Sequence, residues 1–171
     1  MKQYQDYLHI SHESISPFID DNSTILILGS FPSVKTREIG FYYGHPQNRF
    51  YKVISGIFNE DMPISILDKT QLLSKHHIAL YDVIYECDII GSSDSSIKNV
   101  IPIDIKDILN RYPHIKTIIL NGGLAKKLFD KYLLEDINSN ISIRYCPSTS
   151  PANAKMNLSQ LIDAYKDALK M

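Results

Sequence analysis

Four short apolar runs divide the chain, and each is bounded by residues that favour turns. β-branched and other apolar side chains predominate in these runs. Short runs of this kind are typical of parallel strands that are covered on both faces. The pattern therefore predicts buried strands at residues 24–28, 78–83, 115–120 and 141–145.

Segments with helical periodicity separate and follow these runs. Their apolar residues recur with the spacing of one helix face, which predicts helices at residues 48–58, 65–75, 104–111, 124–134 and 158–169. Strands that alternate with helices form a parallel sheet with the helices packed on its faces. We therefore expect an α/β three-layer sandwich, with a mostly parallel four-stranded central sheet and helices on both faces.

Length and segmentation favour a single domain. A chain of 171 residues is long enough to bury a core and a water-excluding pocket. The sequence has neither an internal repeat nor an interdomain linker, so we expect one domain over residues 1–171. Residues 86–101, which include Gly91 and four nearby serines, form the longest irregular stretch, and we expect a surface or binding loop there.

Composition excludes a disordered chain and a strongly basic one. Hydrophobic residues make up 44% of the chain and charged residues 22%, with a net charge of -1. No overall positive field therefore draws the protein to nucleic acid. A local basic patch contains Lys35, Arg37, His45, Arg49 and Lys52. Taken alone, so sparse a run is more typical of a solvated surface.

The two cysteines, Cys87 and Cys146, exclude some kinds of site. They are distant in sequence and form no Cys-x-x-Cys motif, so they supply neither a disulfide framework nor the four thiolates of an iron–sulfur cluster. The first residues lack an apolar signal core, and no apolar run approaches the length of a membrane span. We expect a cytoplasmic protein with no membrane partner.

Two of the predicted strands run into small loops that are rich in Pro and Ser. The first loop is Gly-Ser-Phe-Pro-Ser at residues 29–33, and the second loop is Pro-Ser-Thr-Ser-Pro-Ala-Asn-Ala at residues 147–154. Two such loops can meet at one edge of an α/β sheet, where N–H groups and hydroxyls bind phosphate. This layout is typical of an active site.

These segments resemble the uracil-DNA glycosylase superfamily, and more narrowly its hypoxanthine-DNA (deoxyinosine) glycosylase branch. The resemblance rests on four segments in the same order: the two loops, Gly-Phe-Tyr-Tyr-Gly-His-Pro-Gln-Asn-Arg-Phe at residues 40–50, and Leu-Asn-Gly at residues 120–122. It implies that the chain hydrolyses the bond between deoxyribose and a deaminated base in base-excision repair. We expect a monofunctional enzyme that acts on DNA without metal or cofactor, since no lysine is placed as an evident Schiff-base nucleophile. The oligomeric state stays open, with a monomer as the default.

Asn121 is the residue that the resemblance assigns to reading the base. It stands where a predicted strand ends and Gly122 begins the next segment. Its amide offers one donor and one acceptor, which match the N–H and carbonyl of hypoxanthine or uracil. The alternative is that Asn121 caps the following helix.

The base pocket implied by the resemblance includes Gly29, Ser30 and Phe31 of the first loop. Phe41 is favoured as the ring that stacks on the flipped base, because the uracil enzymes place a Phe after this loop. Its neighbours Tyr42 and Tyr43 remain alternatives, and aromatic residues are more often part of the core.

The first loop departs from its relatives at the residue that positions water. The uracil enzymes carry Gly-Gln-Asp-Pro-Tyr-His, with a polar third residue, whereas this chain has Phe31. We expect Asn48 to take over that role, with Gln47 and His45 as the alternative residues. The structural alternative is that Asn48 is only the N-cap of the following helix. Cys146 also replaces the motif His that stabilises the leaving base. Both departures argue against efficient uracil excision.

The remaining polar residues of these segments suit DNA contacts. Hydroxyls and amides bind phosphate, and a protruding loop can press into the minor groove. Ser-Pro turns also occur without a ligand. The residues expected to contact DNA are Ser33, Arg49, Ser148, Thr149, Ser150, Pro151 and Asn153.

The choice of base stays open at this level. Hypoxanthine is favoured, and uracil or xanthine are the alternatives; a uracil or mismatch-specific enzyme is the second interpretation. A third is a noncatalytic nucleic-acid-binding protein that kept the fold after Phe31 and Cys146 replaced the usual groups.

Overall fold

A parallel sheet of four strands lies at the centre of the computed structural model, which describes residues 6–170. The strand order is β3 (Ile78–Asp82), β2 (Ile25–Gly29), β6 (Thr117–Asn121) and β7 (Ser142–Cys146). All three pairings are parallel, so the four carboxyl ends lie at one edge. The predicted sheet and its four strands are confirmed.

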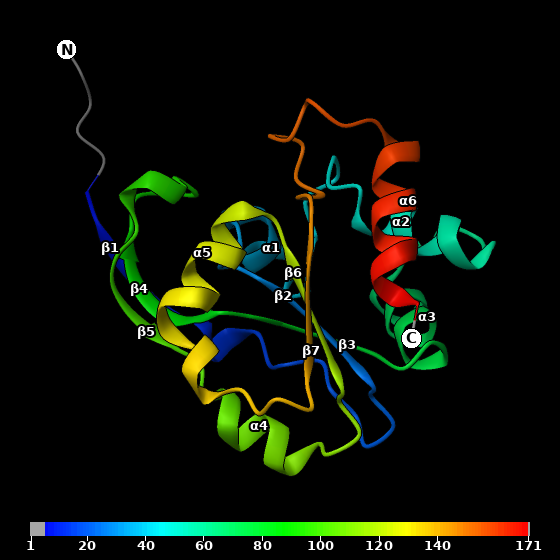
Figure 1. Ribbon diagram of the computed structural model, residues 1–171. Helices are drawn as coiled ribbons and strands as arrows, with labels where there is room; N and C mark the ends of the chain where they lie inside the picture. Colours follow the sequence, from blue (N-terminus) through cyan, green and yellow to red (C-terminus); the bar gives the residue numbers. More distant parts are fainter. Residues whose placement is uncertain (1–5, 171) are drawn as a thin grey trace.

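Helices cover both faces of this sheet, as the sequence predicted (Figure 1). On one side lie α2 (Phe50–Phe58), α3 (Ile66–Lys75) and α6 (Leu158–Leu169). On the other side lie α4 (Ile105–Arg111) and α5 (Gly123–Tyr132). Capping boxes at Ser65 and Asn157 fix the starts of α3 and α6.

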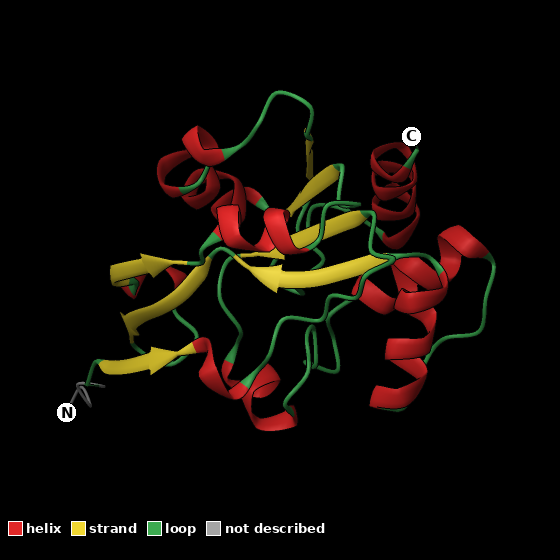
Figure 2. Ribbon diagram, turned by 90° about the horizontal axis from the view of Figure 1, so that it is seen from below, coloured by secondary structure: helices red, strands yellow, loops and turns green. Residues whose placement is uncertain are grey.

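A second, antiparallel sheet flanks the first one (Figure 2). It contains β1 (Leu8–Ser11), β4 (Ile84–Ile89) and β5 (Lys98–Pro102), in the order β1-β4-β5. The sequence predicted an irregular loop over residues 86–101, and this was wrong for the two strands there. Both strands leave side chains exposed and carry polar residues, so they lack a continuous apolar run. Only the turn between them, with a 3-10 helix at Asp94–Ser96, is irregular.

A short helix, α1 (Val34–Ile39), follows the first loop and was also not predicted. Ser33 caps its first turn, and Gly40 ends it with φ of 84°. Six residues are too few to show helical periodicity. Two further 3-10 helices lie at His12–Ser14 and Leu134–Asp136.

The core lies between the central sheet and its helices. The strands β2, β3 and β6 are buried along their whole length. The edge strand β7 leaves most of its side chains exposed, so the prediction of a buried strand at residues 141–145 was wrong as to burial. Phe50, Tyr51, Phe129 and Tyr165 are the largest side chains in the core. Within residues 6–170, no helix is long and apolar enough to cross a membrane.

Candidate active site at the carboxyl edge of the sheet

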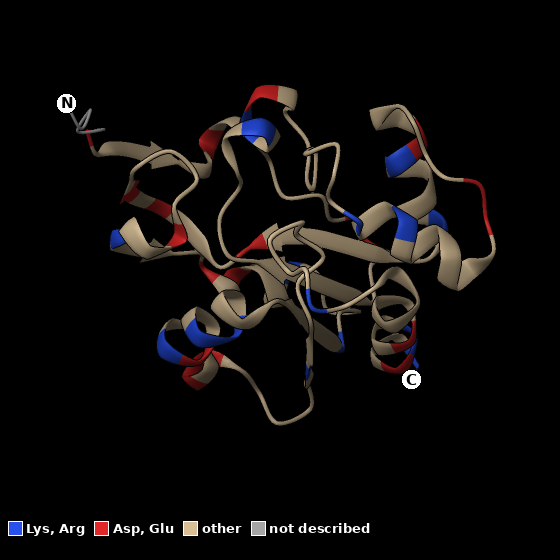
Figure 3. Ribbon diagram, turned by 90° about the horizontal axis from the view of Figure 1, so that it is seen from above, with Lys and Arg blue, Asp and Glu red and all other residues tan. Residues whose placement is uncertain are grey.

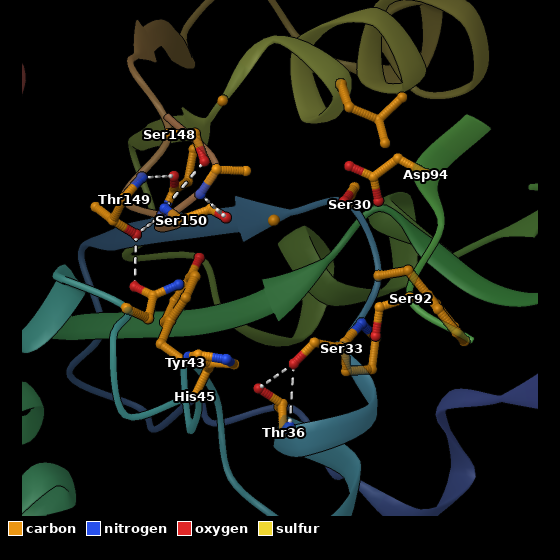
Figure 4. A pocket seen from close by; sticks show the side chains of 18 of the residues that line it. Ser30, Ser33, Thr36, Tyr43, His45, Ser92, Asp94, Ser148, Thr149 and Ser150 are labelled. Carbon is orange, nitrogen blue, oxygen red and sulfur yellow. Dashed lines mark hydrogen bonds between the residues drawn. The ribbon is translucent and has the colours of Figure 1, made fainter. Parts of the chain in front are cut away.

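A cleft of about 760 Å³ opens at the carboxyl edge of the central sheet. Both loops line it, together with the start of α5 and with Tyr43, His45 and Asn48. Figure 4 shows Ser148, Thr149 and Ser150 on one side of the cleft, and Ser33 and Thr36 on the other. The expectation that the two loops meet at this edge is confirmed.

A chain of buried hydrogen bonds joins three segments of the cleft through Thr149. The Asn121 side chain accepts a bond from Thr149 N and donates one to Thr149 Oγ1, both at 3.1 Å. Thr149 Oγ1 in turn donates to Asn48 Oδ1 at 2.9 Å. Thr149 is completely buried, so this hydroxyl is a structural link and does not reach DNA, contrary to the sequence prediction.

Asn121 lies in the cleft but is not a helix cap. Its side chain is 8% exposed, and both ends of its amide bind Thr149. These bonds hold the second loop over the end of β6. The amide that the sequence assigned to the base edge therefore has a structural task as well.

Asn48 presents only part of its amide to the cleft. Its Oδ1 accepts from Phe50 N at 3.0 Å and from the Thr149 hydroxyl. The Phe50 N–H fixes the orientation of the amide, because an NH₂ group cannot accept that bond. The Nδ2 group has no hydrogen-bond partner among the described residues, and Asn48 lines the cleft. Asn48 thus bonds the first N–H of α2 from the position before the N-cap residue, Arg49, and keeps a free donor group.

The two alternatives to Asn48 lie nearby in different settings. His45 lines the cleft, and its Nδ1 accepts a bond from Gln47 N at 3.1 Å. Gln47 is exposed and is not part of the cleft wall.

The aromatic rings in the cleft are not the one favoured from sequence. Phe41 is 8% exposed, packs edge-on against Phe18 and Tyr42, and does not line the cleft. Phe31 and Tyr43 do line it. Tyr43 lies on the face of Phe50, with 4.1 Å between ring centroids.

Arg49 is also placed differently from the prediction of a DNA contact. Its guanidinium donates to the carbonyls of Met156 at 2.6 Å and Asn153 at 2.8 Å. Its own N–H donates to Thr149 O at 3.0 Å. Arg49 therefore braces the second loop from within and does not line the cleft.

The other residues assigned to DNA contacts line the cleft and shape its loops. Ser33 Oγ accepts from Thr36 N at 3.1 Å, and Ser148 Oγ accepts from Ser150 N at 3.1 Å. Asn153 Nδ2 donates to Ser148 O at 3.0 Å. Pro151 is exposed at the tip of the second loop. The predicted residues that line the cleft are Ser33, Ser148, Ser150, Pro151 and Asn153, with Gly29, Ser30 and Phe31 of the base pocket.

Sequence reasoning missed a buried His–Asp pair at the cleft. Asp82 ends β3, lines the cleft and is 5% exposed. Its Oδ2 lies 2.7 Å from Nε2 of His12, which is also buried. Burial lowers the pKa of His12, but the hydrogen bond and charge of Asp82 outweigh it, so the pKa is raised overall. An aspartate at the end of an apolar strand was the available signal.

Cys146, which replaces the motif His, points away from the cleft. Its side chain is fully buried, and Sγ lies 3.8 Å from Ala164 O in α6. Burial raises the pKa of this thiol to about 12. Cys146 is therefore a core residue that cannot serve a leaving base.

Charge near the cleft is dispersed. Figure 3, seen from above this end of the sheet, shows Lys and Arg on several separate helices. Within the described residues, no group of three or more His, Cys, Asp or Glu side chains is arranged to hold a metal ion.

Several known proteins are similar to this chain in sequence or in fold. The uracil DNA glycosylase superfamily model matches residues 16–170. A hypoxanthine DNA glycosylase of Methanosarcina barkeri is 32% identical over 111 residues, covering 64% of this chain and 70% of the relative. A second one, of Methanosarcina acetivorans, is 30% identical over 140 residues, covering 81% and 86%. The solution NMR structure of a candidate uracil DNA glycosylase from Methanosarcina acetivorans is similar, with a TM-score of 0.75 at 26% identity, covering 91% of this chain and 97% of that one.

Proposed function

The chain belongs to the uracil DNA glycosylase superfamily, and from this membership we propose that it is a monofunctional DNA glycosylase that removes hypoxanthine. The resemblance inferred from sequence is confirmed, and the two curated relatives described above are hypoxanthine DNA glycosylases. The substrate of this chain is the part that we propose.

The observation that carries the proposal is the hydrogen-bonded chain through Thr149. It fixes the two asparagines that the family resemblance selected at one cleft, on rigid elements. Groups that are fixed before the reaction begins lower the cost of reaching the transition state. A bound nucleotide would therefore meet an already ordered wall.

Hydrolysis places two demands on this wall. The bond between C1′ and the base nitrogen breaks, and its electron pair leaves with the base. A water oxygen bonds to C1′ and loses a proton to solvent, and the departing base takes up a proton from solvent, which gives a free base and an abasic deoxyribose. Asn48 Nδ2 is the open donor that would hold this water by its oxygen, because Oδ1 is already engaged.

Stacking on the flipped base falls to Phe31 in this proposal. The ring lines the cleft, whereas Phe41 packs away from it. The same substitution that removes a polar group from the first loop thus supplies an aromatic surface. Stacking on such a ring contributes about 1–3 kcal/mol per base.

The cleft walls would bind the DNA backbone on both sides of the flipped nucleotide. The first turn of α5 lines the cleft beside Ser148, and free N–H groups at a helix start favour phosphate. Ser33 stands on the opposite wall. The exposed tip at Pro151, braced by Arg49, is shaped to enter the gap left by the base.

Base release from defined oligonucleotides tests this function. Single- and double-stranded DNA with one hypoxanthine, uracil or xanthine is incubated with the protein and then treated with alkali, which cuts abasic sites. We expect fastest cutting at hypoxanthine and no cutting before alkali, as befits a monofunctional enzyme.

Faster release of uracil under matched conditions would contradict the substrate. Tight binding with no base released would indicate a noncatalytic binding protein. Strand scission before alkali would instead indicate a lyase step.

A further inference from the structure

Two polar atoms without protein partners meet on the floor of the cleft, above Gly29. A methyl group placed on Gly29 would lie 2.5 Å from Asp82 Oδ1 and 3.5 Å from the Tyr43 hydroxyl. Strand pairing explains the first contact, because Gly29 and Asp82 are partners at the carboxyl ends of β2 and β3. The absence of a side chain at Gly29 leaves a space that both oxygens border.

His12 fixes Asp82 as a hydrogen-bond acceptor. Asp82 Oδ2 is bound by His12 Nε2 at 2.7 Å, and His12 Nδ1 lies 2.6 Å from Ile15 O. A carbonyl only accepts, so Nδ1 carries a proton, and a carboxylate opposite Nε2 favours a proton there too. The Asp82 carboxylate is thereby held in one orientation, and its Oδ1 has no hydrogen-bond partner among the described residues.

The Tyr43 hydroxyl is a buried group whose proton has no acceptor among the described residues. Its oxygen is inaccessible to solvent; the Asn121 side chain lies near it, but no contact has the geometry of a hydrogen bond. Buried polar groups are almost always satisfied, so such an exception calls for an explanation. The ring is immobilised on Phe50, and the Tyr43 backbone has φ of 55°, which is uncommon for a bulky residue. This rigid hydroxyl is kept at the cleft at a cost to stability.

We propose that Asp82 Oδ1 and the Tyr43 hydroxyl together recognise the lactam edge of the flipped base. Deamination of adenine converts N1 from an acceptor to an N–H donor and replaces the 6-amino donor by a carbonyl acceptor. Asp82 accepts the N1–H of hypoxanthine, and Tyr43 donates to its O6. Adenine would turn the lone pair of N1 toward the carboxylate and is rejected.

This inference rests on the proposed function and adds its specificity residues. Asn48 Oδ1 already accepts two hydrogen bonds within the protein, so it is poorly placed to accept the N–H of a base, whereas Asn121 Oδ1 accepts one, from Thr149 N. Donation to O6 also strengthens as negative charge develops on the leaving base, a task that Cys146 cannot perform. Uracil and guanine carry the same edge, so this pair separates deaminated bases from adenine and cytosine only.

The first test replaces the donor that Asp82 reads. In 1-methyl-2′-deoxyinosine the N1–H becomes a methyl group, while O6 and the glycosidic bond remain. We expect the parent protein to release 1-methylhypoxanthine at least about tenfold more slowly than hypoxanthine in single-turnover assays. Equal rates would overturn the inference.

Two substitutions show whether Asp82 acts as a hydrogen-bond acceptor for the base or as a general base that removes a proton. Asp82→Ala removes the acceptor and opens space at N1, so hypoxanthine release slows and the preference over the 1-methyl base shrinks. Asp82→Asn keeps an oxygen toward the cleft if its NH₂ donates to a neutral His12, so hypoxanthine release stays within about tenfold of the parent. An Asn variant as slow as the Ala variant would assign Asp82 to proton transfer and overturn its role as reader.

Tyr43→Phe tests the Tyr43 hydroxyl in the same way. The substitution removes a hydroxyl that makes no hydrogen bond within the described residues, so we expect the fold to be kept. We expect hypoxanthine release to slow by about tenfold or more while the melting temperature is unchanged or higher. Tyr51→Phe is the control: its buried hydroxyl donates to Tyr42 O at 2.8 Å, so that variant melts lower and keeps the parent rate. Parent-like release by Tyr43→Phe would overturn the inference.

Failure of the inference and failure of the function give different results. If the parent protein releases no base from any oligonucleotide, the proposed function is wrong, and the inference falls with it. If the parent releases hypoxanthine and both Tyr43→Phe and Asp82→Ala match its rate, only the inference is wrong.

Discussion

Asn48 shows how one side chain can serve both the fold and the reaction. Its oxygen accepts hydrogen bonds from Phe50 N and the Thr149 hydroxyl, and the residue lines the cleft. Local sequence favoured a plain N-cap, and the family resemblance favoured a catalytic role. The N-cap prediction was wrong, because Arg49 is the N-cap residue of α2; the catalytic role is our proposal.

Asn48→Ala is expected to lower the single-turnover release of hypoxanthine by about two orders of magnitude, the scale seen when a positioned dipole is lost. Binding of the damaged DNA should persist, which gel-shift titration measures. Loss of the two hydrogen bonds to Asn48 Oδ1 will also lower the free energy of unfolding, by about 1–3 kcal/mol.

Asn48→Asp controls for that loss, because a carboxylate keeps the acceptor for Phe50 N and Thr149 Oγ1. We expect parent-like melting and faster release than Asn48→Ala, since a carboxylate can orient water and offset positive charge. Parent-like release by Asn48→Ala, with a dead His45→Ala or Gln47→Ala, would move the role to a neighbour.

His12 and Asp82 lie beyond what sequence reasoning could pair. They are separated by 70 positions, and Asp82 follows an apolar run in which it reads as the end of a strand. Only the register of β2 against β3 brings Asp82 beside Gly29. The sequence also did not show which of the three consecutive aromatic residues, Phe41, Tyr42 and Tyr43, lines the cleft, because each has a large apolar ring.

The His12–Asp82 pair should make stability depend on pH. The pKa of His12 is raised above its usual 6.5 in the folded protein, so folding favours the protonated ring. This contribution is complete below about pH 6.5 and is lost as pH rises through the raised pKa. Chemical denaturation from pH 5.5 to 8.5 should show a steeper decline for the parent than for His12→Gln. Identical slopes would show that His12 does not titrate in this range.

At the scale of elements, the second loop is the part that the sequence described least well. Its position after a strand was predicted, but Thr149 and Arg49 were assigned to DNA, whereas both act inside the protein. A Thr among serines and prolines carries no local sign of burial. The contacts that bury it come from Asn48 and Asn121, which lie far away in sequence.

Thr149→Val should uncouple the loop from both asparagines without changing the volume of the side chain. It removes the hydrogen bond that Thr149 Oγ1 donates to Asn48 and the one that it accepts from Asn121. We therefore expect the free energy of unfolding to fall by about 1–3 kcal/mol and base release to slow. Thr149→Ser keeps the hydroxyl and should release base close to the parent rate. Equal rates for the Val and Ser variants would show that the link does not order the site.

At the scale of the whole molecule, the central sheet was predictable and its companion was not. Strands such as the one at residues 24–28 are buried on both faces, so they appear in the sequence as continuous apolar runs and can be recognised there. The strands β4 and β5 are polar on one face and end at a serine-rich turn, so local pattern did not separate them from a loop. The edge where the loops meet followed from topology alone, since parallel strands end together.

Release of free hypoxanthine from duplex DNA tests the whole account most directly. A duplex with a single deoxyinosine is incubated with excess protein, and the released base is quantified by mass spectrometry. We predict one hypoxanthine per duplex, with the DNA strand intact until alkali is added and release strongly reduced in Asn48→Ala. Stoichiometric binding of that duplex with no free hypoxanthine would contradict the account.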